Sequence, residues 1–177
     1  QLVNRGAQVT LISGPTNIQS PQNVKLITVK TADEMLAQTN KYNKKIDVAV
    51  FCAAVADFKV KKISNKKIKK NTLTTLKLIK NIDILKKIST QKTNRPKFIV
   101  GFSAETGHKI LAKKKLEAKN CDMIIFNKIS KKNKVFGLDE NKISILTKNK
   151  IVNYSKFSKL KCANLIVDSI YKEIKNK

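Results

Sequence analysis

Short apolar runs separated by longer polar stretches constrain the fold of this chain more than any other feature. Residues 47–53 are almost continuously apolar, and residues 98–103 and 123–126 have a similar character. Runs of this length without polar alternation are typical of parallel strands that are covered on both faces. A segment with helical pattern, residues 107–119, separates the last two runs. The sequence therefore predicts an α/β fold with a Rossmann-like, doubly wound, mostly parallel sheet.

The remaining segments extend this alternation. Residues 9–12 and 24–29 are predicted strands, and a capping box from Thr31 to Glu34 indicates the start of a helix. Near the end, residues 142–147 and 150–154 predict a hairpin around Asn149. The closing helix should dock on the sheet through an apolar stripe at steps of three and four residues, formed by Leu160, Ala163, Val167, Ile170 and Ile174.

Residues 58–70, with the sequence FKVKKISNKKIKK, differ from the rest of the chain and are followed by a β-like run at 76–79. We expect an exposed, lysine-rich flap. Two interpretations stay open at this point. The lysines could form a solvated edge that resists strand pairing, or they could bind a polyanion such as a triphosphate that screens their mutual repulsion. The lysines of this flap are Lys59, Lys61, Lys62, Lys66, Lys67, Lys69 and Lys70.

The net charge of +26 points to nucleic acids, anionic membranes or small phosphorylated ligands as partners. Only Arg5 and Arg95 are arginines, and the abundance of lysine, asparagine and isoleucine suggests the compositional bias of an AT-rich genome. A base-reading protein should use more arginine, and a single-strand binder should interleave aromatic residues. A lysine-rich nucleic-acid-binding module therefore remains the alternative function, although the sequence does not favour it.

Several kinds of site are not indicated by the sequence. Cys52, Cys121 and Cys162 are far apart and His108 is the only histidine, so neither a zinc site nor a Ser-His-Asp triad is predicted. Cys52 and Cys121 adjoin apolar runs, and we expect both to be buried, reduced thiols. The chain has no apolar run of membrane-spanning length, which favours a cytoplasmic protein. Neither a Walker A run nor a nicotinamide fingerprint GxGxxG is present.

Ligands of open α/β sheets bind at the carboxyl ends of the strands, so the loops that begin at Ala53, Ser103 and Asn127 are candidate sites. Ala53 and Ala54 are small enough to let the backbone approach a substrate. Asp57 could accept hydrogen bonds from a sugar or a base, or could be a solvated cap. Phe102 could stack on a base or fill the core. Lys115 and Lys119, one helical turn apart, could clasp a phosphate chain or form a solvated face.

A set of motifs, taken in order, resembles the phosphopantothenate cysteine ligase family over almost the whole chain. The most specific part is AAVADF from Ala53, followed by KIKK from Lys67 and GFSAET from Gly101. The weaker matches are GAQVTLISGP from Gly6, NIDI from Asn81, KKLEAK from Lys114 and FGLDEN from Phe136. This resemblance implies that the chain is one ligase domain, residues 1–177, of coenzyme A biosynthesis.

The resemblance implies a reaction in which CTP activates 4′-phosphopantothenate as an acyl cytidylate and L-cysteine then displaces CMP. Lys67 resembles the flap lysine of the family and is the expected catalytic residue. Magnesium is expected together with CTP, although the chain shows no carboxylate cluster and no protein metal ligand is predicted. Preference for CTP over ATP stays open. The expected CTP contacts are Asp57, Lys67, Asn81, Ile82, Asp83, Ile84, Phe102, Lys115 and Lys119.

The resemblance also shows where this chain departs from the family. Ile82 stands where proline is common, and Phe126 stands where a small residue is common. The segment that begins at Gln1 enters in the middle of an element, and we expect the first strand and the Gly-rich loop of the family to precede it. The chain alone is therefore expected to be inactive or nearly so. Family members form dimers with the flap near the partner subunit and usually carry a fused N-terminal, flavin-dependent decarboxylase domain.

Overall fold

The computed structural model describes residues 1–44, 46–64, 66–69, 75–105, 109–129 and 139–176. A 3-10 turn, Val3–Arg5, ends at Gly6, whose φ of 82° lies in the left-handed region that glycine adopts without strain. The strands are β1 (Val9–Ser13), β2 (Val24–Thr28), β3 (Val48–Phe51), β4 (Phe58–Val60), β5 (Leu78–Lys80), β6 (Phe98–Glu105), β7 (Met123–Lys128), β8 (Glu140–Thr147) and β9 (Ile151–Ser158). The helices are α1 (Ala32–Tyr42), α2 (Ile84–Ser89), α3 (Lys109–Ala118) and α4 (Lys159–Lys175).

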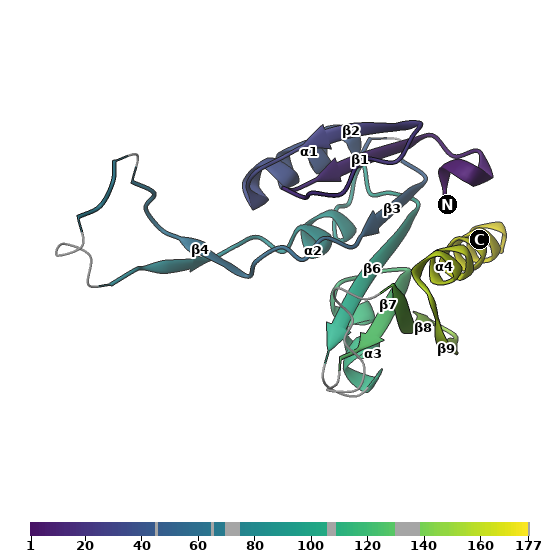
Figure 1. The fold of residues 1–177 in the computed structure, drawn as a ribbon. Helices are drawn as coiled ribbons and strands as arrows, with labels where there is room; N and C mark the ends of the chain where they lie inside the picture. The colour runs from purple at the N-terminus through teal and green to yellow at the C-terminus, as the bar shows by residue number, and fades with distance from the viewer. Residues whose placement is uncertain (45, 65, 70–74, 106–108, 130–138, 177) are drawn as a thin grey trace.

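A five-stranded sheet with the order β3-β6-β7-β8-β9 forms the centre of the fold (Figure 1). Its first three strands are parallel, and the hairpin β8-β9 adds two antiparallel strands. The hairpin connection lies at the predicted place, where the Thr147 N–H donates to the Lys150 carbonyl at 2.8 Å. The predicted α/β fold with parallel strands and a C-terminal hairpin and helix is confirmed.

The strands β1 and β2 form a second, two-stranded parallel sheet. Among the described residues, no strand ladder joins this pair to β3, which is an edge strand of the central sheet. The helix α1 starts at the predicted capping box: the Thr31 hydroxyl accepts from the Glu34 N–H at 3.1 Å, and the Glu34 carboxylate accepts from the Lys30 N–H at 2.7 Å. This helix contacts β1, and its Met35 and Leu36 side chains pack against the same core cluster as Phe51 of β3.

Two apolar clusters cover the two faces of the central sheet. Because side chains alternate along β6, Ile99 belongs to the cluster under α2 and α3, whereas Phe98 and Val100 belong to the cluster under α4. The predicted stripe of α4 is partly wrong. Leu160 and Ile174 are exposed. The helix instead docks through side chains spaced four residues apart, namely Cys162, Ile166 and Ile170.

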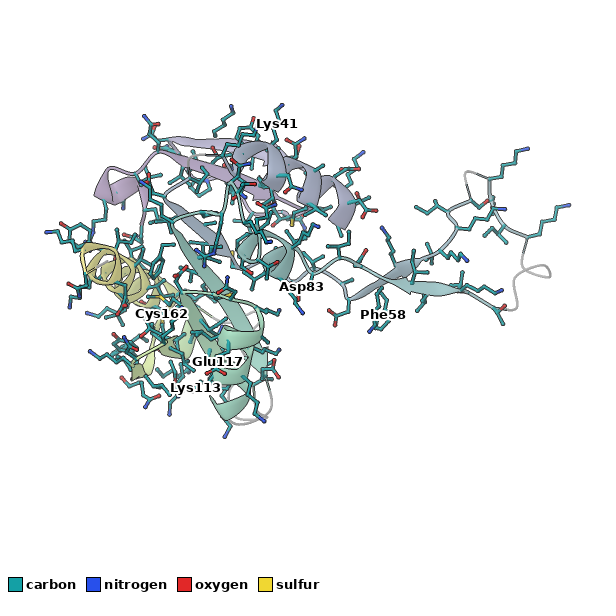
Figure 2. The ribbon with its side chains drawn as sticks, turned by 180° about the vertical axis from the view of Figure 1, so that it is seen from behind. Lys41, Phe58, Asp83, Lys113, Glu117 and Cys162 are labelled. Atoms are coloured by element: carbon teal, nitrogen blue, oxygen red, sulfur yellow. The ribbon has the colours of Figure 1, made fainter. Side chains whose placement is uncertain are left out.

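The lysine-rich flap is a two-stranded arm that projects from the body of the molecule (Figure 1). Its strands β4 and β5 are antiparallel, with Lys59 opposite Ile79. The Lys59 ammonium forms an ion pair with Asp33 in the first turn of α1, which ties the base of the arm to the body. Phe58 marks this base in Figure 2. The prediction of an exposed flap is confirmed for the part of it that the structure describes.

Helix α2 and two of the cysteines differ in part from what the sequence predicts. The short helix α2 was not predicted; it starts at Asp83, whose carboxylate accepts from the Lys86 N–H at 3.0 Å. Cys121 is buried, as predicted, and this burial raises the pKa of its thiol to about 12. Cys52 is exposed, so the prediction that it is buried was wrong. It follows the last residue of β3, where the apolar run leaves the sheet.

Candidate functional site

Lys115 of α3 lies against the end of β6. Its ammonium donates to the Glu105 carboxylate, and the Ser103 hydroxyl donates to the same Oε1 atom at 3.1 Å. Ser103 and Glu105 point to the same face of β6 because they are two residues apart. The hydrogen bond from Lys115 is the main reason that the pKa of Glu105 lies below its usual value, and burial opposes this effect. Glu105 is therefore ionised at neutral pH.

Lys119 makes a second pair just beyond the end of α3. Its ammonium lies 3.2 Å from the Asp83 carboxylate, whose other oxygen caps α2. The Lys119 carbonyl accepts from the Ser89 hydroxyl, which ties this turn to α2. Asp83 lies on the body close to the base of the arm (Figure 2). The structure thus brings Lys115, Lys119 and Asp83 together, on the α2–α3 face of the central sheet.

The loop after β3 is joined to the segment that precedes α2. The Asn81 N–H donates to the Asp57 carbonyl at 2.8 Å, and the Asn81 side-chain amide donates to the Ala56 carbonyl at 2.8 Å. Ala53, Ala54 and Asp57 are exposed in this loop. The predicted contacts in AAVADF and NIDI therefore lie side by side, and the Asp57 side chain is accessible to a ligand.

The other candidates in NIDI and β6 lie in different environments. Ile82 is 50% exposed, whereas the Ile84 side chain is 6% exposed and belongs to the core cluster under α2 and α3. Ile84 can therefore offer a ligand only its backbone. Phe102 is half-buried and packs against the cluster under α4, on the opposite face of β6 from Ser103 and Glu105. The structure does not bring its ring to the α3 lysines.

Lys67 is exposed in the segment between β4 and β5, on the projecting arm (Figure 1). The arm points away from the body of the molecule, whereas α3 packs on the central sheet (Figure 1). The structure therefore leaves Lys67 apart from Lys115 and Lys119. The first half of the motif FGLDEN, from Phe136 to Leu138, lies outside the described residues.

The described residues do not fit a magnesium ion held by protein side chains. Nowhere in this part of the chain do three or more His, Cys, Asp or Glu residues gather at one point. The two carboxylates nearest the α3 lysines, Glu105 and Asp83, each pair with a lysine. Within the described ranges, no helix is long and apolar enough to cross a membrane.

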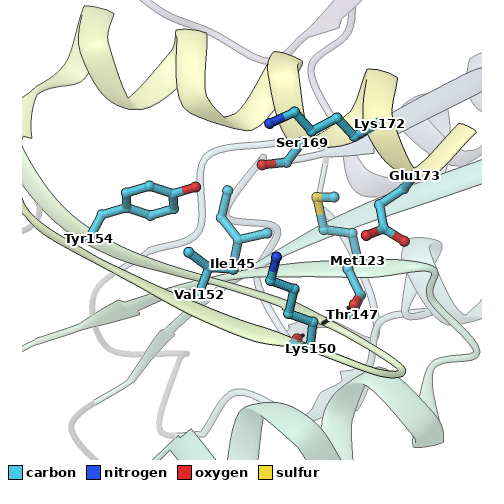
Figure 3. A pocket seen from close by; sticks show the side chains of 9 residues that line it. All are labelled: Met123, Ile145, Thr147, Lys150, Val152, Tyr154, Ser169, Lys172 and Glu173. Carbon is cyan, nitrogen blue, oxygen red and sulfur yellow. Dashed lines mark hydrogen bonds between the residues drawn. The ribbon is translucent and has the colours of Figure 1, made fainter. Parts of the chain in front are cut away.

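A hollow of about 120 Å³ lies on the other side of the sheet, between the hairpin β8-β9 and α4 (Figure 3). Tyr154, Ser169 and Lys172 line it, together with the apolar side chains of Met123 and Ile145. None of the predicted site residues lines this hollow. It is therefore separate from the site on the α2–α3 face.

Glu105 was not singled out from the sequence, and Ser103 was expected only as the start of a loop, whereas both residues lie within β6. Glu105 and Ser103 lie within the motif GFSAET, and their spacing of two places both side chains on one strand face. That alternation could have indicated them, but their contact with Lys115 depends on how α3 packs on β6. Chemically, the ammonium groups of Lys115 and Lys119 can stabilise a phosphate chain, and the accessible Asp57 can accept hydrogen bonds from a nucleoside.

Comparison with known proteins identifies the family of the chain. Residues 1–174 match the family described as "DNA/pantothenate metabolism flavoprotein C-terminal domain". A protein of Borreliella burgdorferi named "Coenzyme A biosynthesis bifunctional protein CoaBC" is 41% identical over 97% of this chain and 44% of its own length. The protein of the same name from Haemophilus influenzae is 44% identical over 94% of this chain and 42% of its own length. The chain thus spans less than half the length of these curated relatives.

A solved structure, the C-terminal domain of a coenzyme A biosynthesis bifunctional protein CoaBC, superposes with a TM-score of 0.81. The two chains are 28% identical, and the match covers 99% of this chain and 79% of the solved one. The fold, the order of the motifs and the match over nearly every residue lead to the same assignment. The chain belongs to the family of the DNA/pantothenate metabolism flavoprotein C-terminal domain.

Proposed function

We propose that this chain is the part of a coenzyme A biosynthesis enzyme that joins 4′-phosphopantothenate to L-cysteine at the expense of CTP. The observation that carries the proposal is the pair of lysines, Lys115 and Lys119, held on the α2–α3 face of the sheet beside the Asn81–Asp57 connection. The names of the relatives, which refer to coenzyme A biosynthesis, support it.

The proposed reaction has two steps. The carboxylate oxygen of 4′-phosphopantothenate attacks the α-phosphorus of CTP, the bond to the bridging oxygen breaks, and pyrophosphate leaves. The amine nitrogen of cysteine then attacks the acyl carbon of the acyl cytidylate. CMP leaves with the electron pair of the carbon–oxygen bond, and the nitrogen loses a proton as the amide forms. Negative charge builds up on phosphate oxygens in both steps, so nearby cations lower both barriers.

The site residues keep their proposed roles. Lys115 and Lys119 are proposed to bind the phosphates, and Asp57 with the Asn81–Ile84 backbone to bind the nucleoside. Ala53 and Ala54 are proposed to let the substrate approach the loop after β3. Phe102, on the α4 face of β6, is proposed to contact the nucleotide away from the α3 lysines. Lys67 is proposed to stabilise the reacting groups, which requires the arm to meet the α3 lysines of its own chain or of a second copy.

The arm supports a dimer. It exposes large apolar side chains, among them Phe58, Ile63, Leu76 and Leu78, with exposed fractions from 53% to 75%. Contiguous exposed apolar surface on one element is typical of an interaction site. We propose that the arm packs on a second copy of the chain. A fused flavin-dependent decarboxylase domain is also proposed, because the relatives are called bifunctional and are more than twice as long as the matched region.

The division of the parallel strands into two sheets supports an additional strand. β1 and β3 belong to separate sheets, although α1 contacts β1 and packs against the same core cluster as Phe51 of β3. A strand between them would use the backbone groups of both edges and would cover apolar side chains beneath α1. We propose that the family's first strand, followed by its Gly-rich loop, takes this place, and that ligase activity requires both.

The decisive test is turnover by the longer protein with 4′-phosphopantothenate, L-cysteine and either CTP or ATP, followed by pyrophosphate release and by mass spectrometry of the amide. Product that depends on CTP and is lost in Lys67→Ala supports both the reaction and the role of Lys67. Lys62→Ala is the matched control, because it removes an exposed lysine from the same arm. A folded dimer that forms no product with either nucleotide would contradict the proposal.

A further inference from the structure

Both lysines of the candidate phosphate site are already paired with carboxylates of the same chain. Lys115 contacts Glu105, which also accepts from Ser103, and Lys119 contacts Asp83. The side chains of these pairs are between 23% and 43% exposed. The pairs are therefore accessible to an incoming anion and are not part of a sealed core.

A phosphate that approaches Lys115 also approaches the negative charge of Glu105, so the two anions compete for one ammonium. Partly exposed ion pairs are worth only about 0.2–1 kcal/mol, because water screens the charges and the side chains lose freedom. A triphosphate carries more charge than a carboxylate and can replace it at a small cost. Until then, the carboxylate holds a long, flexible lysine side chain in one place. The side chain has therefore already lost conformational entropy, and this loss does not weaken ligand binding.

We propose that Glu105 and Asp83 are positioning residues that hold Lys115 and Lys119 as internal counter-ions until the phosphates of a ligand replace them. The proposal rests on the proposed function in one respect, the triphosphate nature of the ligand. Neither carboxylate touches the reacting atoms. Each carboxylate fixes the position of one ammonium before the ligand binds, and the ligand must displace its negative charge.

Two substitutions remove the competing charge and retain the local geometry. Glu105→Gln keeps the Oε1 atom that accepts from Ser103 and Lys115. Asp83→Asn keeps an oxygen that can cap α2, since asparagine is as good an N-cap as aspartate. Glu117→Gln is the matched control, because it removes the same charge from an exposed position on α3 (Figure 2).

The probe is inorganic tripolyphosphate, and two measurements report on it. Calorimetry at low ionic strength gives its Kd for the wild-type chain and each variant. Acylation with an amine-reactive reagent, followed by mass spectrometry, gives the modification rates of Lys115 and Lys119, with the exposed Lys113 as the internal reference. Neither measurement uses turnover, so a failure of the ligase reaction and a failure of this proposal are distinguishable.

We expect Glu105→Gln and Asp83→Asn each to bind tripolyphosphate about two- to fivefold more tightly than wild type, with a difference that shrinks as salt screens the charges. Without the probe, Lys115 should be acylated faster in Glu105→Gln and Lys119 faster in Asp83→Asn, while Lys113 stays unchanged. The probe should protect Lys115 and Lys119. Unchanged or weaker binding in both variants, an equal gain in Glu117→Gln, or no protection of either lysine would overturn the proposal.

Discussion

Gly101 lies where β6 passes under α2, and its missing side chain lets the two elements approach. A Cβ at this position would lie 2.8 Å from Leu85 Cδ2 and 2.9 Å from Ile124 Cδ1. Both contacts are shorter than carbon atoms tolerate, and both partners belong to a packed cluster with little room to move. The glycine therefore sets how closely α2, and with it Asp83, approaches the sheet.

We expect Gly101→Ala to lower the free energy of unfolding by about 1–3 kcal/mol, the usual cost of overpacking a core. Urea denaturation followed by circular dichroism measures it. Gly14→Ala is the control, because a Cβ there meets nothing within 4 Å. Its effect should stay within about 0.5 kcal/mol. A Gly101→Ala protein as stable as the control would show that the neighbouring side chains shift freely.

Glu105 should make the stability of the chain depend on pH in the acid range. Its pKa is lowered in the folded protein, chiefly by the hydrogen bond from Lys115. A carboxyl with a depressed folded pKa contributes stability above its unfolded pKa, about 4.3, and loses it as the pH falls through the folded pKa. Wild type should therefore be more stable than Glu105→Gln at pH 7.

This advantage should disappear as the pH falls through the folded pKa of Glu105, below which the carboxyl is protonated in both the folded and the unfolded chain. Urea denaturation of the two proteins at a series of pH values measures the difference. Glu117→Gln, at an exposed position of α3, should show no comparable dependence. A constant difference between wild type and Glu105→Gln from pH 7 to acid would mean that the charge of Glu105 contributes nothing.

At the scale of elements, sequence patterns predicted the helices and strands whose formation depends on a few adjacent residues. The continuous apolar runs predicted β3, β6 and β7, and the capping box predicted the start of α1, because each depends on a few adjacent residues. The docking face of α4 was only partly predicted. Apolar residues at steps of three and four form overlapping stripes, and only the packed sheet decides that Cys162 and Ile170, not Leu160, face it.

The candidate site could be predicted in part, because some of its features depend only on residues that are close in the sequence. Lys115 and Lys119 were recognisable from their spacing on one helix and from the family motifs. Their partners were not, because the Asp83–Lys119 contact joins residues that are 36 positions apart and depends on α2 and α3 packing on one face of the sheet. Likewise, no local pattern shows that the arm holds Lys67 away from these lysines.

The arm carries large apolar side chains that are exposed in a single chain. Ile63 and Leu76 are 75% and 60% exposed, and burying them against a second copy would remove apolar area from water. We expect the double substitution Ile63→Ser and Leu76→Ser to shift the chain from dimer to monomer in sedimentation equilibrium. Leu160→Ser, at a residue of α4 that is 62% exposed, should leave the dimer intact. A wild-type chain that is monomeric at high concentration would contradict the prediction.

At the scale of the whole molecule, no ladder among the described residues connects the parallel pair β1-β2 to the five-stranded sheet. The edge of β3 carries the apolar run that predicted a strand covered on both faces, yet Val50 is 36% exposed. The sequence pattern and the exposure disagree at this one edge. A strand between β1 and β3 would remove this disagreement. It would pair with both edges, cover the exposed edge of β3 and join the two sheets into one.

Hydrogen exchange tests this arrangement directly. In the 177-residue chain, the backbone amides of β1 and β3 should exchange faster than those of β7, which is paired on both sides. In a longer protein that includes the proposed strand and its Gly-rich loop, the amides of β1 and β3 should become protected, while those of β9 at the far edge should not change. Mass spectrometry of peptides from both proteins reads this difference. Protection of β9 alone, or of no strand, would place the additional segment elsewhere and would leave the two sheets separate.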